Sequence, residues 1–374
     1  MAVRIGFAYN LKPQLPAPKK ARESAPPASA PLDHVPASRA LRSDLPQPDL
    51  YAEWDEPETI EAVATALSAV GDVIRLEATR DFPRRLMEAK PDFVFNTAEG
   101  LHGASRESHV PAICEFLGIP YHASDPLSLA LTLHKGRAKE IMAYYGVPTA
   151  PFIVASTRAD ARNVRLPFPL FAKPALEGSG KGITERSLCT NRAKLVQVVG
   201  DLLDTYQEPV LIEAWLPGQE FTVAILGNGK EARCLPLVGM RWEALPLGAK
   251  PIYGYEAKWI WDTPDHPLDL FECPAKIPKE LARDVRAAAL SAYRVIGCRD
   301  WCRVDVRCDA AGRPMVVELN PLPGILPNPQ DNSCFPKAAR AAGMSYDALI
   351  QTVADIAWRR ISGQSLVKRK RAAA

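Results

Sequence analysis

The stretch WCRVDVRCDAAGRPMVVELNPLPG, residues 301–324, predicts two strands of alternating character joined by a turn that contains aspartate, glycine and proline. Because side chains alternate across a strand, Arg303 and Asp305 share one face of the first strand. Glu318 and Asn320 likewise share one face of the second. If the hairpin closes about its alanine–glycine pair, Asp305 lies opposite Glu318. Arg303 then lies opposite Asn320, and one face carries two carboxylates, an amide oxygen and a guanidinium.

The charges of this face have two explanations. Like charges directly opposed across a strand pair are destabilising, so a compensating cation is expected. Hard oxygen ligands suit magnesium, which is usually held by one or two carboxylates together with substrate phosphates. The alternative is an ordinary solvated face, on which Arg303 and Arg307 neutralise the acids. The same alternation assigns Val317 and Leu319 of the second strand to the opposite, apolar face.

Length and composition restrict the class of protein. A chain of 374 residues is too long for one ordinary core, so two or three domains are expected. The composition, 47% hydrophobic and 24% charged, is that of a soluble globular protein. A net charge of +3 gives no reason to expect nucleic acid or a membrane as a partner. Neither a membrane span nor a signal-peptide pattern is found, so we expect a cytoplasmic protein.

The eight cysteines are scattered without C-x-x-C spacing. In a chain of this size, such cysteines are typically small buried hydrophobic residues or free thiols. The closest group, Cys298, Cys302 and Cys308, lacks the paired spacing of zinc sites. The basic run at residues 368–371 indicates a solvated tail rather than a nucleic-acid patch.

The amino-terminal part predicts alternating strands and helices. Strand, helix, strand, helix and strand are expected in turn at residues 3–8, 57–71, 72–76, 82–89 and 91–95. This βαβαβ order implies a parallel sheet with helices on its faces. Residues 11–50, between the first two elements, are rich in proline, alanine and serine. They indicate an extended or disordered insertion or, alternatively, an ordered lid.

Ligands of such a sheet bind beyond the carboxyl ends of its strands. The third strand is followed by NTAEGLHGASRE, so Glu99, His102 and Glu107 are candidates for a substrate site. The alternative for His102 is a structural loop histidine. A helix at residues 107–117 is expected next, and residues 126–145 predict one long amphipathic helix.

A glycine-rich loop follows a strand in the run FAKPALEGSGKGI, which begins at residue 171. Glycines at alternate positions let backbone amides approach an anion, and Lys173 and Lys181 add positive charge. The spacing is neither the dinucleotide-binding G-x-G-x-x-G before a helix nor the G-x-x-x-x-G-K-[ST] of P-loops. A plain flexible loop is the alternative.

Two acids flank a Leu-Pro-Gly turn further along the chain. Glu213 and Glu220 are suited to bind an amine and a ribose, or they lie in solvent. Residues 220–226 are expected to form the strand that neighbours residues 210–213. The long section 238–276 contains glycine and aromatic residues, which favours a lid. Further helices are expected at residues 191–203, 279–296 and 346–360.

Taken together, these runs resemble the ATP-grasp superfamily and, within it, the D-alanine:D-alanine ligases, over nearly the whole chain apart from residues 11–50. The matching runs stand in family order: LHG at 101, EFLGIPY at 115, HKGRAK at 134, FAKPALEGSGKGI at 171, VLIEAWLPGQEFTVAIL at 210, YGYEAKW at 253, RVDV at 303, ELNPLPG at 318 and FPKAARAAGMSY at 335. The resemblance implies an ATP-grasp fold of the α/β (α+β) class. Its domains would be an amino-terminal one at residues 1–124, a central one at 125–212 and a carboxy-terminal one at 213–374, with nucleotide between the last two.

The resemblance also implies roles for individual residues in binding ATP. Lysines would contact the phosphates, Glu213 and its neighbours would read adenine, Glu220 would bind the ribose, and the glycine-rich loop would close over the phosphates. The nucleotide-binding residues implied are Lys135, Lys173, Glu177, Gly178, Ser179, Gly180, Glu213, Trp215, Leu216, Glu220, Lys258 and Val317.

Metal and catalytic roles follow from the same resemblance. Asp305, Glu318 and Asn320 would hold two magnesium ions, for which manganese can substitute. The reaction implied is ADP-forming ligation: ATP phosphorylates a carboxylate to an acyl phosphate, and an amine displaces phosphate to give an amide. The catalytic residues implied are Arg303, which would stabilise the tetrahedral oxyanion, Ser179 and Lys258.

Substrate positions depart from the family pattern. The family's glycine- and serine-rich loop, with a glutamate that grips the first substrate's ammonium, is replaced after the first strand by GFAYNLKPQ. Trp259 stands where a tyrosine is usual, and His134 where an acid is common. The loop before the F-P that begins the next helix is lengthened to ILPNPQDNSC. The substrate-binding candidates are Glu99, His102, Trp259, Gly324 and Ser333.

We therefore expect a ligase of small amino acids or peptides, different from D-alanyl-D-alanine synthesis and acting as a homodimer. Three alternatives stay open. The protein is a true D-alanine:D-alanine ligase of cell-wall assembly, a non-catalytic ATP-binding module, or a ligase that modifies the terminus of a protein or peptide. Intact Arg303, Asp305, Glu318 and Asn320 argue against the non-catalytic module.

Overall fold

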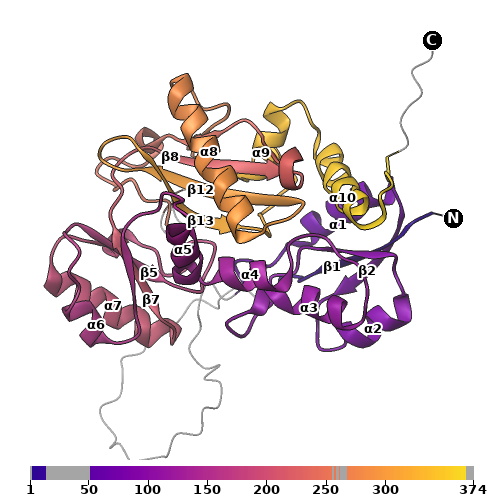
Figure 1. Ribbon diagram of the computed structural model, residues 1–374, viewed down its shortest axis with the longest axis horizontal. Helices are drawn as coiled ribbons and strands as arrows, with labels where there is room; N and C mark the ends of the chain where they lie inside the picture. Colours follow the sequence, from indigo (N-terminus) through magenta and orange to yellow (C-terminus); the bar gives the residue numbers. More distant parts are fainter. Residues whose placement is uncertain (1, 14–50, 255–256, 258–260, 262–267, 368–374) are drawn as a thin grey trace, which may run out of the picture.

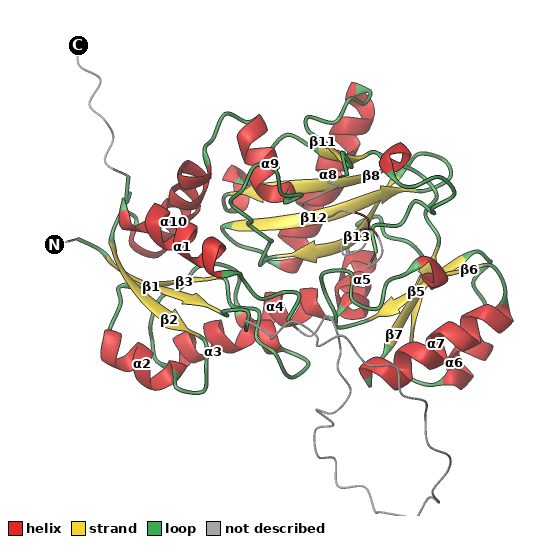
Figure 2. Ribbon diagram, turned by 180° about the vertical axis from the view of Figure 1, so that it is seen from behind, coloured by secondary structure: helices red, strands yellow, loops and turns green. Residues whose placement is uncertain are grey.

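The computed structural model describes residues 2–13, 51–254, 257, 261 and 268–367 (Figures 1 and 2). The insertion predicted at residues 11–50 lies almost wholly outside the described residues, as do residues 255–256, 258–260 and 262–267 of the predicted lid and the whole basic run 368–371. Three β-sheets organise the remaining chain. One is parallel and two are antiparallel, which confirms the mixed α/β class.

The first sheet confirms the predicted βαβαβ order. Its strands lie in the order β2-β1-β3, and Ile5 of β1 pairs with Val73 on one side and Phe93 on the other. The buried runs IGFA and FVFN suit a parallel sheet, whose central strands are covered on both faces. The elements are β1 (Arg4–Tyr9), α1 (Pro57–Ser68), β2 (Asp72–Glu77), α2 (Phe82–Ala89), β3 (Phe93–Asn96), the 3-10 helix Arg106–Ser108 and α3 (His109–Phe116).

The largest sheet contains the hairpin of residues 301–324. β12 lies between β8 and β13, with β10 and β11 beyond β8 and with β9 paired to β8 (Figure 2). The predicted register is confirmed, because Asp305 pairs with Glu318 and Arg303 with Asn320. The elements of this part are β8 (Glu220–Leu226), β9 (Arg233–Cys234), β10 (Val238–Met240), β11 (Phe271–Glu272), α8 (Lys279–Ile296), β12 (Trp301–Cys308), β13 (Pro314–Asn320), α9 (Cys334–Ala341) and α10 (Tyr346–Ser362).

A β-bulge in β13 changes one predicted orientation. Val306 pairs with Val316 directly after Asp305 pairs with Glu318, so Val317 is the extra residue of β13. Val316 is fully buried in the core beneath α8, whereas Val317 is only partly buried. The prediction that Val317 faces away from Glu318 is wrong, because strict alternation fails where one strand gains a residue.

The third sheet is antiparallel, with strand order β4-β7-β5-β6 and with α6 and α7 packed together beside it (Figure 1). β7 pairs with β4 and β5, while β8 belongs to the largest sheet. The prediction that residues 220–226 neighbour the strand at 210–213 is therefore wrong, since the turn between them carries the chain from one sheet to another. The elements are β4 (Phe152–Ala155), α6 (Arg158–Arg162), β5 (Leu170–Pro174), β6 (Leu188–Cys189), α7 (Arg192–Tyr206) and β7 (Val210–Ala214).

Two helices replace the single helix predicted at residues 126–145. α4 (Pro126–Leu133) ends and α5 (Lys135–Tyr144) begins at His134, whose backbone leaves the helical region with a ψ of 87°. The Nδ1 atom of His134 accepts a hydrogen bond from the backbone N–H of Arg137 and so caps α5. Periodicity alone does not reveal the break, because the apolar positions continue through it.

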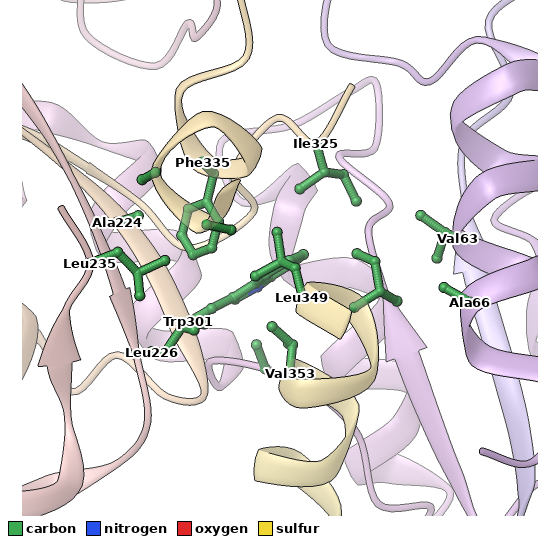
Figure 3. Close-up of a cluster of buried hydrophobic side chains, with 14 of the residues drawn as sticks. Val63, Ala66, Ala224, Leu226, Leu235, Trp301, Ile325, Phe335, Leu349 and Val353 are labelled. Atoms are coloured by element: carbon green, nitrogen blue, oxygen red, sulfur yellow. The ribbon is translucent and has the colours of Figure 1, made fainter. Parts of the chain in front are cut away.

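Trp301, at the start of β12, lies in a core shared by the first and the largest sheets (Figure 3). Its indole is fully buried and packs edge-on against Phe95 of β3 and Phe335 of α9, with ring centroids 5.9 and 5.6 Å away. Leu349 and Val353 of α10 lie beside it in Figure 3. The last helix therefore joins the two sheets through one hydrophobic core.

The cysteines and helices agree with the composition. All eight cysteines are free and five of them are buried, as their scattered spacing predicted. None of the described helices is long and apolar enough to cross a membrane.

Candidate active site

A cavity of about 650 Å³ is lined by strands of the largest and third sheets and by segments next to the first sheet, such as Glu53 and Glu99. Most of the predicted site residues meet here, although the sequence places them far apart. The predicted residues that line the cavity are Glu99, Glu107, Lys135, Lys173, Gly178, Ser179, Gly180, Glu213, Trp215, Leu216, Glu220, Arg303, Asp305, Val317, Glu318, Asn320, Gly324 and Ser333.

The charged face of the hairpin points into this cavity. Arg303 lies between the two acids, with its Nη2 atom 3.0 Å from Asp305 Oδ2 and 3.7 Å from Glu318 Oε1. Thr222 of β8 donates a hydrogen bond of 2.9 Å to the other carboxylate oxygen of Asp305. Burial alone would lower the pKa of the Arg303 guanidinium, but Asp305 and Glu318 outweigh it and raise that pKa. The face is thus an enclosed charged site.

The donor set of this face fits a magnesium ion. Two carboxylates and an amide oxygen lie at paired positions of adjacent strands, and Lys135 Nζ comes within 3.6 Å of Glu318 Oε2. Among the described residues, no three histidine, cysteine, aspartate or glutamate side chains lie close enough together to hold a metal ion by themselves. A site with two carboxylates therefore leaves coordination positions for water and for substrate phosphates, which is how magnesium is usually held.

Two buried lysines hold Glu213 from opposite sides. Lys173 of β5 lies 2.9 Å from one carboxylate oxygen of Glu213, and Lys139 of α5 lies 2.8 Å from the other. Burial alone would raise the pKa of the Glu213 carboxyl, but the two ammonium groups outweigh it and lower that pKa to about 2. Lys139 also donates to Thr149, which donates to the backbone carbonyl of Val316 at the bulge. The sequence analysis gave Lys139 no role at the site.

The glycine-rich loop needs backbone conformations that most residues avoid. Ser179 and Gly180 have φ angles of 52° and 76°. Lys135 Nζ donates a hydrogen bond to the backbone carbonyl of Glu177, which ties α5 to the start of the loop. The carboxylate of Glu177 does not line the cavity and pairs with Lys181 at 3.0 Å instead. Lys135 therefore ties the loop to α5, while the Glu177–Lys181 pair links two residues of the loop itself.

Aromatic rings and an arginine form another wall of the cavity. Phe171 and Trp215 stack with their ring centroids 5.6 Å apart. The guanidinium of Arg307 lies 4.2 Å from the centroid of the Trp215 ring, and its Nη1 atom donates a hydrogen bond of 2.8 Å to Glu220 Oε2. Arg307 was predicted only as a neutralising residue of a solvated face, whereas it lines the cavity.

Acids gather at the end of the cavity nearest the first sheet. Glu53 Oε2 lies 2.9 Å from the guanidinium of Arg106 and 2.7 Å from Lys181 Nζ. Burial raises the pKa of Asp55 to about 7 and that of Glu107 to about 7, and burial together with Glu107 raises the pKa of Glu99. These acids give the cavity a wall of carboxyl groups.

Glu53 was missed because residues 14–50 separate it from the first strand in the sequence. In the fold, Leu11 and Asp55 form a parallel bridge, and the backbone N–H of Asp55 donates to the carbonyl of Asn10. This pairing brings Glu53 close to the carboxyl end of the first strand. The residues that directly follow this strand in the sequence include no glutamate. Motifs of neighbouring residues do not predict that residues 11 and 55, which are distant in sequence, lie side by side.

The remaining predicted residues have other positions. His102 is exposed and does not line the cavity, in keeping with the loop-histidine alternative. Ser333 is buried, donates to the carbonyl of Gly324 at 3.0 Å and accepts from the backbone N–H of Leu326. Lys258 and Trp259 lie outside the described residues.

Comparisons with known proteins agree with this geometry. The family model of the D-ala D-ala ligase C-terminus matches residues 141–355. The uncharacterized protein y4sG of Sinorhizobium fredii is 33% identical over 335 residues, which cover 87% of this chain and 95% of the relative. The D-alanine–D-alanine ligase of Cupriavidus necator is 33% identical over 264 residues, which cover 70% and 74%.

A solved structure supports the same fold. The crystal structure of D-alanine–D-alanine ligase from Bacillus anthracis complexed with ATP superposes with a TM-score of 0.63 at 20% sequence identity. The superposition covers 96% of this chain and 98% of that chain. The family model matches more than half of the chain, and the relatives are covered over more than two thirds of their length. The chain therefore belongs to the D-alanine–D-alanine ligase family and has its ATP-grasp fold.

Proposed function

We propose that this protein is an ADP-forming ligase that uses ATP to join a carboxylate to an amine through an acyl phosphate. The observation that carries the proposal is the convergence of Lys135 and Lys173 with the Arg303, Asp305 and Glu318 cluster on one cavity. The lysines supply charge for phosphates, and the cluster supplies oxygen ligands and a guanidinium for the reacting groups.

ATP would lie between the third and the largest sheets. These sheets would belong to a central domain, residues 125–212, and to a carboxy-terminal domain, residues 213–374. Residues 1–124 would form the amino-terminal domain. Lys135 and Lys173 would contact the phosphates, and the loop around Ser179 would cover them. Glu213, the backbone at Trp215 and Leu216, and Val317 would surround the adenine. The low pKa of Glu213 keeps its carboxylate ionised and locked between lysines, so it would accept hydrogen bonds from the base.

Asp305, Glu318 and Asn320 would hold the metal. Bound magnesium, or manganese in its place, would neutralise charge on the β- and γ-phosphates. The residues around it would do the positioning. Thr222 fixes the orientation of Asp305, and Lys135 approaches both Glu318 and the glycine-rich loop. These contacts would hold a substrate carboxylate in position for in-line transfer.

The chemistry would proceed in two steps. An oxygen of the substrate carboxylate attacks the γ-phosphorus, the bond to the β-phosphate oxygen breaks, and ADP leaves. The amine nitrogen then attacks the acyl carbon and loses a proton, and inorganic phosphate departs to leave an amide. Arg303 would stabilise the oxyanion of the tetrahedral intermediate; its guanidinium lies beside Asp305, one of the proposed metal ligands, which supports this role.

The substrate is proposed to be an amino acid or peptide other than the D-alanine pair. At the first-sheet end of the cavity, Arg106 and Lys181 neutralise Glu53. Burial raises the pKa values of Asp55, Glu99 and Glu107 in the same region. This end of the cavity therefore combines a paired carboxylate with carboxyl groups that are harder to ionise. A true D-alanine–D-alanine ligase is the second candidate. It is favoured by the 33% identity to the enzyme of that name from Cupriavidus necator.

A phosphate-release screen over pairs of acids and amines tests the proposal. Phosphate should appear from ATP only when both an acid and an amine are supplied, and mass spectrometry should find their amide. Turnover with D-alanine alone, in preference to all other pairs, would select the second candidate. Release of phosphate with neither co-substrate, or none with any pair, would contradict ligation.

A further inference from the structure

Arg307 lines the cavity, yet the proposed function gives it no role. It lies on β12 and pairs in register with Glu220 of β8. Arg307 lies two residues after Asp305 on the same strand. It contacts Trp215, which in turn stacks on Phe171. Its surroundings indicate what it does.

Three contacts fix the plane of the Arg307 guanidinium. The group lies over the indole ring of Trp215 at 4.2 Å and over that of Trp242 at 5.2 Å. Its Nη1 atom donates to Glu220 Oε2 at 2.8 Å. Stacking on aromatic rings and a carboxylate partner are the interactions that hold an arginine fork rigid. The remaining N–H groups of Arg307 therefore have fixed directions.

Two of those groups lack an acceptor. Arg307 is only 6% exposed, and its Nε and Nη2 atoms have no hydrogen-bond partner among the described residues. A buried N–H group without an acceptor is destabilising, and arginine can only donate. A ligand of this part of the cavity would therefore have to present acceptor atoms to Arg307.

A ribose diol has the required chemistry. Each hydroxyl has one hydrogen to donate and lone pairs that accept, so it can bond to a carboxylate and to a guanidinium at the same time. Glu220 is the residue that the family resemblance implies for the ribose, and it is the partner of Arg307. A carboxylate alone binds only the hydrogens of the diol.

We propose that Arg307 and Glu220 form a joint ribose subsite, in which Glu220 accepts from the hydroxyl groups of the nucleotide and Arg307 donates to their oxygen atoms. Arg307 is then a specificity-determining residue that distinguishes ribonucleotides from deoxyribonucleotides. The inference rests on the proposed use of ATP and extends it to the recognition of the sugar.

Calorimetric titration of the full chain with ATP, 2′-deoxy-ATP and 3′-deoxy-ATP, without acid or amine, tests the inference. The unchanged protein should bind ATP roughly tenfold more tightly than at least one deoxy analogue, as expected for loss of a charge-assisted hydrogen bond. Arg307→Met should weaken ATP binding by roughly the same factor and bind ATP and that analogue alike. Arg313→Met, an exposed arginine of the same hairpin, is the matched control and should change nothing.

Other outcomes overturn the inference. If Arg307→Met weakens ATP and both analogues by one common factor, the arginine only supports the fold of the cavity wall. Unchanged affinity in that variant excludes any contact with nucleotide. If Arg307→Met does not fold, Arg307→Lys replaces it, since lysine keeps the charge but has no planar fork. In Arg307→Lys, the ratio of the affinities for ATP and the deoxy analogue must fall at least about threefold. An unchanged ratio rejects the proposal.

This test separates the two proposals. A protein that shows the ribose pattern but joins no acid and amine contradicts only the ligase reaction. Ligation without any ribose preference contradicts only the role of Arg307. Failure of the unchanged protein to bind ATP at all contradicts both.

Discussion

At the scale of single residues, Glu213 shows how strongly the site is built around charge. Its carboxylate lies between Lys139 and Lys173 with almost no exposure to water. Its pKa, about 2, is below the ordinary value of 4.5. The pairing therefore stabilises the folded state fully above pH 4.5, and this contribution is lost as the pH falls from there toward about 2.

Lys139→Met should break this arrangement by leaving Glu213 with one ammonium partner. We expect a loss of about 3 kcal/mol in the free energy of unfolding at neutral pH, measured by urea denaturation. The loss should shrink as the pH falls below 4.5, because protonation of Glu213 removes its interaction with Lys139 in the unchanged protein. Arg137→Met, an exposed position on the same helix, is the control and should change stability by less than about 0.5 kcal/mol. Equal stability of the two variants would contradict the pairing.

Asp305→Asn and Glu318→Gln test the proposed metal site. Each should reduce ATP turnover about 100-fold or more and raise the magnesium concentration needed for half-maximal rate, since one anionic ligand is lost. Thermal melting should show that both variants remain folded. Asp309→Asn, in the turn of the same hairpin, should keep the magnesium dependence of the unchanged protein. Undiminished turnover in either cavity variant would reject the metal assignment.

The sequence was informative for residues on regular strands and less so elsewhere. Alternation along β12 and β13 correctly predicted that Arg303, Asp305 and Glu318 share one space. Glu53 could not be predicted, because it reaches the cavity only through the pairing of residues 11 and 55 across the insertion. Lys139 was visible in the sequence, but its burial depends on the packing of α5 against β4 and α8.

At the scale of elements, the glycine-rich loop is confined by the segment that precedes α1. A Cβ atom on Gly178 would lie 2.2 Å from Glu53 Oε1, and Arg106 and Lys181 hold that carboxylate in place. Gly178→Ala should therefore displace the loop and lower kcat/KM for ATP turnover about tenfold, because small errors in position are costly in catalysis. In a Glu53→Ala background the obstacle is gone, so Gly178→Ala should have little further effect. The same loss in both backgrounds would contradict this contact.

Element boundaries were predicted well where periodicity and caps agree. The helix predicted at residues 279–296 has the bounds of α8. The bulge at Val317, the histidine cap at residue 134 and the transfer of the chain between sheets after β7 were not predicted. The bulge and the transfer depend on pairing between distant strands, and the cap on a local hydrogen bond of His134, whereas apolar periodicity reports only which face of an element is buried.

At the scale of the whole molecule, the first and the largest sheets share the core around Trp301 (Figure 3). Trp301→Ala should leave a large cavity there and lower the free energy of unfolding by about 4 kcal/mol in urea denaturation. Phe116→Ala is the control, because Phe116 is 90% exposed and should contribute less than about 0.5 kcal/mol. If Trp301→Ala cost no more than the control, the sheets would not be joined through this core.

The central claim is that a substrate carboxylate becomes an acyl phosphate in the cavity where Arg303, Asp305 and Glu318 meet the two phosphate-facing lysines. It is tested most directly with an acid whose carboxylate oxygens are both ¹⁸O, supplied with ATP and the amine that turns over with it. Transfer of the γ-phosphoryl group to the carboxylate predicts that one ¹⁸O atom appears in each inorganic phosphate and the other stays in the amide. Unlabelled phosphate, or label found in AMP, would contradict the claim.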